Sequence, residues 1–527
     1  MMIHLGWSDV AVIGERGDKG GDVVGVKLGE GKHQTWVAQV KAKSGEYCGV
    51  DGLNEVMQAQ GIYSANVAVL CSNATFTASV DSRKGELTSA GFDVRLWNGR
   101  FCNELIDKMP LFSVGRRQPR GYQSRIINKV IADYDAGIQR SQFIVATGLG
   151  KTLIASEIVN ELRERGLNKF LVLCHSRDLA LQLEQSFWSQ ISKELPTRFF
   201  FDGQPPLVCD GINFGLFQTL RNWLNGLEPT SFDAVIVDEA HYALAHGFRA
   251  CIEHLSPKLL IGMTATPWRG DGVSLNELFG PPIDRVSLVD GMSEGYLAQV
   301  DYRLLCDNIN WEEVPGLTSE RLSIRDLNKS LFIPQRDETI LGEILREARK
   351  LESPRIAIFS PSIEHGRIFA DMINAAGLPC RALSGVDKVE RRRRLLEFGS
   401  GKLTAVTAVN VLNEGIDIPE VNMMVFLRAT HSRRIFVQQL GRGLRLSEGK
   451  DRVLVLDFVS DIRRIAALID FGNELAANKT EKKRIFLDSD VRFSDTRAET
   501  FVQSWLRDVA RLEDCEDSEK LTFPEVW

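Results

Sequence analysis

The residues best suited to chemistry lie in one short stretch, Phe143–Thr152, which reads Phe-Ile-Val-Ala-Thr-Gly-Leu-Gly-Lys-Thr. A strand-like run meets a glycine turn and then a helical pattern, so backbone N–H groups and the helix dipole favour an anion at the turn. Lys151 can reach the β- and γ-phosphates of ATP, and Thr152 can hold Mg²⁺. Val145 stands where the full phosphate-loop pattern has glycine, so a plain strand–helix turn is the alternative. The predicted nucleotide-binding residues of this stretch are Thr147, Gly148, Gly150, Lys151 and Thr152.

Two acidic residues end a second strand-like run, Ala234–Val237, and open the tetrad Asp-Glu-Ala-His. Parallel sheets bind ligands at the carboxyl ends of their strands. We therefore expect Asp238 to approach the Mg²⁺ that Thr152 holds, and Glu239 to orient and activate the attacking water. The alternative is a strand that ends in two solvated acids.

Two further segments carry side chains that suit the same site. The turn Leu260–Arg269 contains Thr264 and Thr266, whose hydroxyl groups are expected to hydrogen-bond the acids of the tetrad. Gln123 lies at the start of a predicted helix, and its amide offers both an acceptor and donors, which suits the edge of an adenine. A glutamine on the protein surface is the alternative for Gln123.

Two arginines late in the chain can supply positive charge to the same nucleotide. Arg442 and Arg445, in the run Gln438–Arg445, are one helical turn apart, so both can face one cleft. An arginine presented across a domain interface completes the site of many NTPases, and its planar guanidinium suits bidentate phosphate contact. A basic surface helix is the alternative.

Taken together, these motifs resemble those of the superfamily 2 helicases. The tetrad at Asp238 and the Thr-Ala-Thr-Pro-x-Arg turn look most like the XPB-like and restriction-subunit branch of duplex-DNA translocases. The run Asn413–Pro419 resembles the fifth helicase motif, and Gln438–Arg445 resembles the sixth. The resemblance implies two RecA-like domains that bind ATP between them, with Gly415 and Asp417 at the boundary between nucleotide and nucleic acid.

A second set of chemically suited residues lies near the start of the chain. The strand-like run Val23–Leu28 follows a glycine-rich turn that ends in Asp22, and the run Thr35–Lys41 comes next. Alternation places Gln39 and Lys41 on one face of the second strand. If the strands pair, the Asp22 carboxylate can hold Mg²⁺ near an ammonium that stabilises developing charge, which suits metal-dependent phosphodiester cleavage. A surface hairpin with outward polar residues is the alternative.

The first hundred residues resemble the Mrr-like branch of the PD-(D/E)xK restriction endonucleases. The matching parts are Gly20–Asp22, Val37–Lys41 and Val67–Thr77. The resemblance implies catalytic roles for Asp22, Gln39 and Lys41, with Gln39 in place of the usual acid and with Mg²⁺ or Mn²⁺ held at Asp22. Glu15 is a further candidate ligand.

The start of the chain departs from that family pattern. The family usually opens with a helix, and the few residues before Val10 leave little room for one. We therefore expect the start to be trimmed or misplaced, and any acidic ligand on that helix to be missing. Because Gln39 also replaces the usual acid, a domain that binds DNA without cutting it is the main alternative.

Composition limits the class of protein. The chain has 527 residues, of which 44% are hydrophobic and 25% charged, as is ordinary for soluble globular proteins. The net charge of −6 does not suggest a nucleic-acid binder, although local basic grooves matter more than the total. The nine cysteines are scattered without a CxxC pair, which argues against a metal cluster and favours a reducing cytoplasm. No apolar run nears the ~18 residues of a membrane span, and the first residues do not form a signal peptide pattern. We expect a cytoplasmic protein without a membrane partner.

The order of these patterns predicts an α/β fold, with two RecA-like parallel-sheet motor domains preceded by a small α/β restriction-endonuclease-like domain. The predicted parts are a nuclease domain (1–110), a linker (111–118), a first motor domain (119–287), a connecting segment (288–350), a second motor domain (351–475) and a helical tail (476–527). The run Glu390–Phe398 is predicted to be a basic helix that forms either a solvated face or a contact with the DNA backbone.

The two resemblances imply an ATP-dependent DNA helicase or translocase fused to a metal-dependent DNA endonuclease. The expected partners are duplex DNA, with forks or ends as candidate features, and a further subunit of a defence system. The expected role is restriction of foreign DNA such as a phage genome, or else DNA repair. A DNA translocase or remodeller whose first domain only binds DNA is one alternative, and an RNA helicase is another. The sequence does not predict the oligomeric state.

Overall fold

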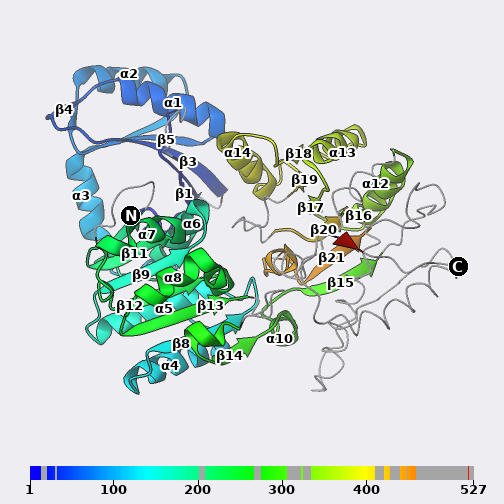
Figure 1. Ribbon diagram of the computed structural model, residues 1–527. Coiled ribbons are helices and arrows are strands. Elements are labelled where there is room, and N and C mark those ends of the chain that lie inside the picture. Colours follow the sequence, from blue (N-terminus) through cyan, green and yellow to red (C-terminus); the bar gives the residue numbers. More distant parts are fainter. Residues whose placement is uncertain are drawn as a thin grey trace, which may run out of the picture. The chain divides into compact units, whose positions relative to one another are not determined.

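Figure 1 shows the computed structural model of the chain, coloured from the N-terminus in blue to the C-terminus in red. The residues described are 1–13, 20–29, 32–200, 208–265, 274–304, 322–323, 334–409, 420–427, 439–447, 449–458 and 520–521. The chain divides into two compact units. The first unit contains residues 1–137, 152–236 and 255–258, and the second contains residues 138–151, 237–254 and 259–527.

A five-stranded sheet of order β1-β2-β3-β5-β7 forms the N-terminal part of the first unit (Figure 1). Its strands are β1 (Ser8–Val12), β2 (Val23–Gly29), β3 (Lys32–Lys41), β5 (Val67–Ser72) and β7 (Asp93–Trp97). The first three are antiparallel neighbours, whereas β5 is parallel to β3 and β7 is parallel to β5. The other elements here are β4 (Tyr47–Cys48), α1 (Asp51–Tyr63), β6 (Thr75–Phe76), α2 (Ala78–Ser89) and α3 (Gly99–Lys108).

Alternation along β3 assigns its side chains to the two faces of this sheet. Trp36 belongs to a buried core with Trp7 and Trp97, and the ring centroids of Trp7 and Trp36 lie 5.4 Å apart. Gln39 and Lys41 are odd-numbered and therefore lie on the opposite face. Helix α1 packs on that face, where a Cβ atom at Gly52 would lie 3.0 Å from Lys41 Cγ. The predicted pairing of the strands beside the polar residues is confirmed.

Helices and strands alternate through the rest of the first unit. They are α4 (Gly121–Asp135), α5 (Lys151–Glu164), β9 (Lys169–Cys174), α6 (Arg177–Trp188), β10 (Thr197–Phe200), β11 (Gly211–Leu216), α7 (Phe217–Trp223) and the 3₁₀ turn η1 (Leu224–Gly226). Strands β10, β11 and β9 are parallel neighbours. The side chains of β9 from Phe170 to Cys174 are all buried, as expected for a parallel strand covered on both faces.

Hydrogen bonds fix the segment between α3 and α4 within the first unit. The Lys193 ammonium donates to the carbonyl oxygen of Met109 at 2.6 Å. The Arg116 guanidinium donates to both oxygens of the Glu157 carboxylate, at 3.3 and 2.7 Å. Glu157 is only 7% exposed, so this ion pair is largely shielded from water. Within the predicted linker, 111–118, Arg116 is therefore anchored to α5, and the carbonyl oxygen of Leu111 accepts from the Lys193 N–H at 2.8 Å.

The second unit contains a group of parallel strands and the 3₁₀ turn that follows the acidic tetrad. Strands β13 (Leu259–Thr264), β8 (Arg140–Val145) and β14 (Pro282–Val286) are parallel neighbours. The other elements are the end of β12 (Ala234–Asp238), η2 (Ala240–Leu244), α8 (His246–His254), α9 (Asn276–Phe279) and α10 (Leu288–Ser293). The carboxyl ends of β8 and β12 lead into the two motifs that the sequence singled out.

A second, six-stranded sheet of order β15-β21-β20-β17-β19-β18 lies later in this unit, and its described pairings are all parallel. Its strands are β15 (Gln299–Leu304), β17 (Ile356–Phe359), β18 (Cys380–Ala382), β19 (Ala405–Ala408), β20 (Met423–Phe426) and β21 (Arg452–Asp457). The helices are α12 (Pro334–Ala348), α13 (Ile363–Ala375) and α14 (Lys388–Gly399), and the short strands β16 (Leu322–Ser323) and β22 (Lys520–Leu521) pair with each other. Parallel sheets in an α/β chain confirm the predicted fold class.

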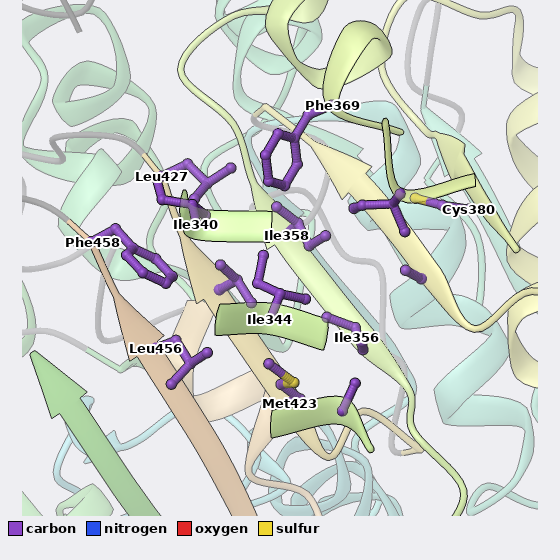
Figure 2. Close-up of a cluster of buried hydrophobic side chains, with 14 of the residues drawn as sticks. Ile340, Ile344, Ile356, Ile358, Phe369, Cys380, Met423, Leu427, Leu456 and Phe458 are labelled. Atoms are coloured by element: carbon purple, nitrogen blue, oxygen red, sulfur yellow. The ribbon is translucent and has the colours of Figure 1, made fainter. Parts of the chain in front are cut away.

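Figure 2 shows the core of this second sheet. Ile340 and Ile344 of α12, four residues apart, pack with Ile356 and Ile358 of β17, and all four are at most 1% exposed. Helix α12 and strand β15 fall in the segment predicted to connect the motor domains, yet both belong to the second sheet and its core. In the part of the chain that the structure describes, no helix is long and apolar enough to cross a membrane.

Candidate functional site

The phosphate loop joins β8 to α5 as the sequence predicts. The loop is fixed at its start, where the Ala146 N–H donates to the carbonyl oxygen of Val286 at 2.9 Å. Gly148 and Gly150 have φ angles of 90° and 79°, which favour glycine. Lys151 opens helix α5, and its Nζ atom donates to the carbonyl oxygen of Val145 at 3.4 Å. The N–H groups at the start of α5 and the Lys151 ammonium thus lie at the carboxyl end of β8. This arrangement of donors suits the binding of a phosphate.

An acid of the tetrad lies beside this lysine. Lys151 Nζ is 3.8 Å from Glu239 Oε1, and the two side chains are 12% and 16% exposed. The backbone of Glu239 has φ 47° and ψ 56°, a left-handed conformation that residues other than glycine rarely adopt. Such a residue costs about 1–3 kcal/mol and is typical of functional sites.

A threonine and a histidine hold the Glu239 carboxylate. Thr264 Oγ1 donates to Glu239 Oε2 at 3.3 Å. His241 Nδ1 lies 3.0 Å from Thr264 Oγ1 and 3.3 Å from Glu239 Oε2. The predicted hydrogen bond between Thr264 and the acids is confirmed, whereas Thr266 lies outside the described residues.

Asp238, the first acid of the tetrad, is buried, and the pKa of its carboxyl is raised. Asp238 is 5% exposed. Burial raises the pKa of its carboxyl to about 7, and the Glu239 carboxylate adds to the rise, while Lys151 and Arg442 oppose it. A buried carboxylate whose charge is only partly compensated fits a bound divalent cation. Thr147 Oγ1 is also buried, and it has no hydrogen-bond partner among the described residues, which leaves a polar atom in the loop for a ligand.

The arginine motif approaches the phosphate loop within the second unit. A side chain at Gly148 would overlap the carbonyl oxygen of Gly441 and would lie 3.5 Å from Arg445 Cγ. Arg442 is close enough to Asp238 to lower the pKa of that carboxyl. The structure therefore brings Gly148, Lys151, the two acids and both predicted arginines to one place.

The remaining predicted nucleotide residues are not all part of this cluster. Thr152 is the second residue of α5 and is half-buried. Gln123 is 4% exposed, and its Oε1 atom accepts from the Arg120 N–H at 2.8 Å, which caps α4. The alternative of a surface glutamine is therefore wrong, because that side chain closes the open end of a helix. Gly415 and Asp417 lie outside the described residues.

The second candidate site is built on β2 and β3 of the N-terminal sheet. Asp22 precedes β2, and its Oδ2 atom accepts from Gln39 Nε2 at 2.7 Å and from the Val40 N–H at 2.5 Å. Gln39 is 5% exposed, and its Oε1 atom is buried without a hydrogen-bond partner among the described residues. The predicted neighbours Asp22 and Gln39 are thus in direct contact.

Sequence reasoning missed a fourth side chain, Glu55 of α1. Lys41 Nζ forms an ion pair with Glu55 Oε2 at 2.5 Å, and the side chains are 27% and 40% exposed. The sequence signal is weak, because Glu55 is one of many acids on predicted helices and stands fourteen residues after Lys41. Glu15, the further ligand that the sequence suggested, lies outside the described residues.

The N-terminal site offers oxygen atoms suited to a hard divalent cation. The Asp22 carboxylate and the unpartnered Gln39 carbonyl oxygen are the kinds of ligand that Mg²⁺ and Mn²⁺ prefer. Within the described residues, no three His, Cys, Asp or Glu side chains gather as a metal cluster, so an amide oxygen would have to take part. The donor set fits a catalytic cation that keeps several water ligands.

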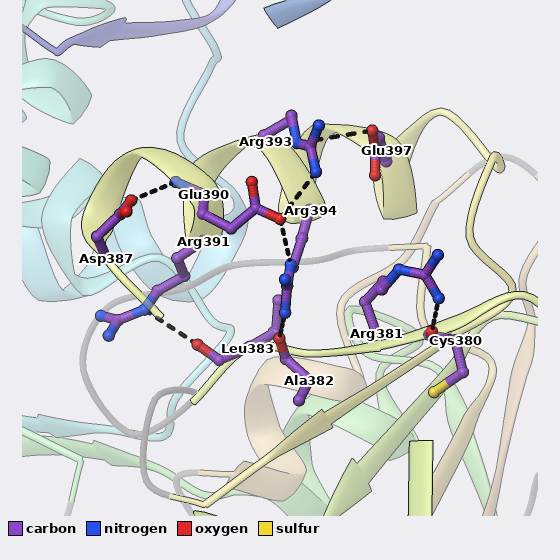
Figure 3. Close-up of polar contacts among 10 residues, drawn as sticks. All are labelled: Cys380, Arg381, Ala382, Leu383, Asp387, Glu390, Arg391, Arg393, Arg394 and Glu397. Carbon is purple, nitrogen blue, oxygen red and sulfur yellow. Dashed lines mark hydrogen bonds and ion pairs between the residues drawn. The ribbon is translucent and has the colours of Figure 1, made fainter. Parts of the chain in front are cut away.

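Figure 3 shows the basic helix α14, for which the sequence left two interpretations open. Arg393 and Arg394 both pair with Glu390 at 2.8 Å. Arg391 Nε donates to the carbonyl oxygen of Leu383 at 3.2 Å. These guanidinium groups are engaged with a carboxylate on the helix and with the loop after β18. The solvated face and the contact with the DNA backbone both stay predictions.

Three family models match separate parts of the chain. Residues 116–269 match the res subunit of type III restriction enzymes, residues 337–447 match the helicase conserved C-terminal domain, and residues 1–106 match a restriction endonuclease model of the Mrr type.

Two curated relatives and one solved structure place these matches in context. A Saccharomyces cerevisiae protein named as an ATP-dependent helicase is 24% identical over 357 residues, covering 64% of this chain and 51% of its own length. The endonuclease subunit of the Escherichia coli type I restriction enzyme EcoAI is 24% identical over 380 residues, covering 65% and 46%. A Vibrio vulnificus fragment assigned as the HsdR subunit of a type I restriction enzyme has a TM-score of 0.53 at 20% identity, covering 87% and 88%. The chain thus spans about half the length of these two curated relatives, and the structural likeness concerns the fold alone.

The two parallel sheets, the phosphate loop and the two helicase matches define a motor of superfamily 2. More particularly, the chain joins this motor to an N-terminal Mrr-type restriction endonuclease domain. Both resemblances expected from the sequence are confirmed, while the individual domain boundaries stay predictions.

Proposed function

We propose that the chain is an ATP-driven DNA translocase or helicase that carries its own metal-dependent DNA endonuclease. One observation carries the proposal: a single chain holds two lysines in the matched motifs, Lys151 and Lys41, each in an ion pair with a carboxylate. The family matches support ATP hydrolysis at the first lysine and phosphodiester cleavage at the second.

At the motor site, the proposed roles follow from the contacts of each side chain. Lys151 and the N-terminus of α5 bind the β- and γ-phosphates of ATP. Glu239, oriented by Thr264, accepts a proton from the attacking water. Arg442 and Arg445 stabilise negative charge on the transferred phosphoryl group. Mg²⁺, which Asp238 and Thr152 would hold, would neutralise further phosphate charge when bound.

At the nuclease site, the proposed roles belong to the Asp22 carboxylate, the Gln39 amide and the Lys41 ammonium. The Val40 N–H and the Gln39 amide fix the Asp22 carboxylate, which leaves the Gln39 carbonyl oxygen free to bind a cation. Lys41 stabilises the charge that develops on the cleaved phosphate. A divalent cation, with Mg²⁺ proposed and Mn²⁺ as a substitute, would polarise the phosphate and activate a water molecule when bound.

The biological role that we propose is restriction of foreign DNA, such as a phage genome, in the cytoplasm. The name of the EcoAI endonuclease subunit and the restriction family models support this role over repair. The proposed substrate is duplex DNA, including forks or ends. A further subunit of a defence system is proposed as a partner, because that relative is named as one subunit of an enzyme.

The test is to incubate the purified chain with linear or supercoiled duplex DNA and a divalent cation, with and without ATP. We expect DNA-stimulated ATP hydrolysis that Lys151→Ala strongly slows, and DNA cleavage that Lys41→Ala strongly slows. DNA-stimulated hydrolysis without cleavage under any condition would leave a translocase whose first domain only binds DNA. Stimulation by RNA alone would make the chain an RNA helicase.

A further inference from the structure

Helix α1 lies against the stem of the nuclease lysine. A Cβ atom at Gly52 would lie 3.0 Å from Lys41 Cγ and 3.4 Å from Lys41 Cε, and 2.8 Å from Leu70 Cδ1. The separations from Leu70 Cδ1 and Lys41 Cγ are shorter than ordinary van der Waals contact. A methyl group at residue 52 would therefore crowd the Lys41 side chain in its present position.

Glu55 of the same helix forms an ion pair with the Lys41 ammonium. It lies three residues after Gly52, and residues three apart share a helix face. The resulting ion pair with Lys41 is 2.5 Å long but more than a quarter exposed on each side. Exposed pairs stabilise folds little, so this pair contributes little to stability.

The same part of α1 also fixes the turn that leads to Asp22. A side chain at Gly20, whose φ is 90°, would overlap the backbone of Glu55. A Cβ atom at Gly21 would lie 3.0 Å from Ala59 Cβ, one turn further along α1. One helix face thus contacts both the lysine and the turn before the carboxylate of the site.

We propose that Glu55 is a positioning residue of the nuclease, and that Gly52 and Glu55 together form a cradle that holds the Lys41 ammonium beside Asp22 and Gln39. The proposal rests on the nuclease function proposed above and extends it. An ammonium has three donors, so Lys41 can keep its bond to Glu55 while it donates to an oxygen of the DNA phosphate. Glu55 thereby supplies, from a helix after the strands, a carboxylate to a site in which glutamine stands at the usual acid position.

The first test compares Glu55→Gln, Glu55→Asp and the control Asp51→Asn, an exposed acid on the same helix, in the full-length chain. Single-turnover cleavage of duplex DNA and equilibrium DNA binding are measured at several Mg²⁺ concentrations. We expect Glu55→Gln to slow cleavage roughly 10- to 100-fold, because small misplacements of a catalytic group have effects of this size. DNA affinity and the Mg²⁺ concentration for half-maximal rate should not change. Glu55→Asp should restore part of the rate, and Asp51→Asn should match the parent.

The second test fills the cradle. Gly52→Ala places a methyl group where the Lys41 stem lies, so cleavage should fall while DNA-stimulated ATP hydrolysis persists. Gly61→Ala is the matched control, because a Cβ atom at Gly61 of the same helix meets nothing within 4 Å. If Gly52→Ala does not fold, as thermal unfolding would show, the Glu55 variants decide.

A double-variant comparison separates positioning from other roles. If Glu55 acts through Lys41, then Lys41→Gln with Glu55→Gln should cleave no more slowly than Lys41→Gln alone, measured with Mn²⁺ to retain a detectable rate. Additive losses, a changed Mg²⁺ requirement in Glu55→Gln, or parent-like cleavage by Glu55→Gln would each overturn the proposal while leaving the nuclease function intact. A parent protein that cleaves under no condition would instead overturn the nuclease function, and this inference with it.

Discussion

Both phosphate-directed sites hold a lysine next to a glutamate, and the two pairs differ in length and exposure. Lys151 and Glu239 are 3.8 Å apart and 12% and 16% exposed. Lys41 and Glu55 are 2.5 Å apart and 27% and 40% exposed. In the motor, the glutamate also contacts Thr264 and His241. In the nuclease, the glutamate contacts the lysine directly and has no catalytic partner of its own in the described contacts.

The difference indicates two uses of the same pair. Charges in a shielded site interact more strongly than charges near water, so removing a group from the motor site should have the larger effect. The nuclease pair is closer to solvent, so its effect should be smaller and come from geometry. Each of the following variants tests one side of this contrast.

The largest effect is expected for Lys151→Ala. The variant removes the ammonium from a shielded site that also contains two carboxylates, so DNA-stimulated ATP hydrolysis should fall on the order of 10³-fold. Phosphate release measures it, and ATP-independent DNA cleavage serves as the control. If cleavage without ATP also disappears, the two sites are not separable.

A smaller loss, roughly 10²-fold, is expected for Lys41→Ala in DNA cleavage, because this lysine is more exposed. ATP hydrolysis by the same preparation should equal that of the parent. Single-turnover cleavage of end-labelled duplex DNA gives the rate. A loss as large as that for Lys151→Ala in its own assay would contradict the contrast in shielding.

Glu184 tests the effect of shielding on a carboxyl that lacks a lysine or arginine partner in the part of the chain that the structure describes. It is a buried acid with no cation at ion-pair distance among the described residues. It is 5% exposed and accepts a hydrogen bond from Thr197, and burial raises the pKa of its carboxyl to about 7. Its pKa in the unfolded chain is about 4.3, so the folded state is favoured less as pH rises from about 4 to 7. Glu184→Gln keeps the hydrogen bond and removes this loss. The variant should gain about 2 kcal/mol over the parent between pH 5 and pH 8, as denaturant unfolding at both values would show. A pH-independent difference would contradict a neutral buried carboxyl.

The smallest effect is expected for Thr264→Val. Losing the hydrogen bond to Glu239 should lower kcat for ATP hydrolysis about tenfold, since such a bond contributes about 1–1.5 kcal/mol. KM for ATP should change little, because the Thr264 hydroxyl hydrogen-bonds Glu239 and His241. A large rise in KM with unchanged kcat would show that Thr264 acts in nucleotide binding.

The sequence predicted the motor cluster well because its motifs are contiguous. Lys151 follows a strand directly, and Asp238 and Glu239 end another, so chain order alone brings them to one sheet edge. Glu55 was not predicted, because its contact with Lys41 depends on how α1 packs on the sheet, which periodicity does not specify. The expectation for Gln123 was based on its residue type alone. Residue type does not predict that its side chain is buried and caps α4.

The same distinction applies to the fold. Paired β2 and β3 followed from alternation beside a glycine-rich turn. The attachment of α12 and β15 to the second sheet did not, because a helix or an edge strand far ahead of the other strands joins a core only through long-range packing.

The most direct test of the central claim measures single-turnover cleavage of linear duplex DNA by the parent and by Lys151→Ala, with and without ATP. If the motor serves the nuclease, ATP should change the rate or position of cleavage in the parent and leave the Lys151→Ala pattern unchanged. Identical patterns with and without ATP in the parent, in a preparation that hydrolyses ATP on the same DNA, would contradict coupling between the two sites.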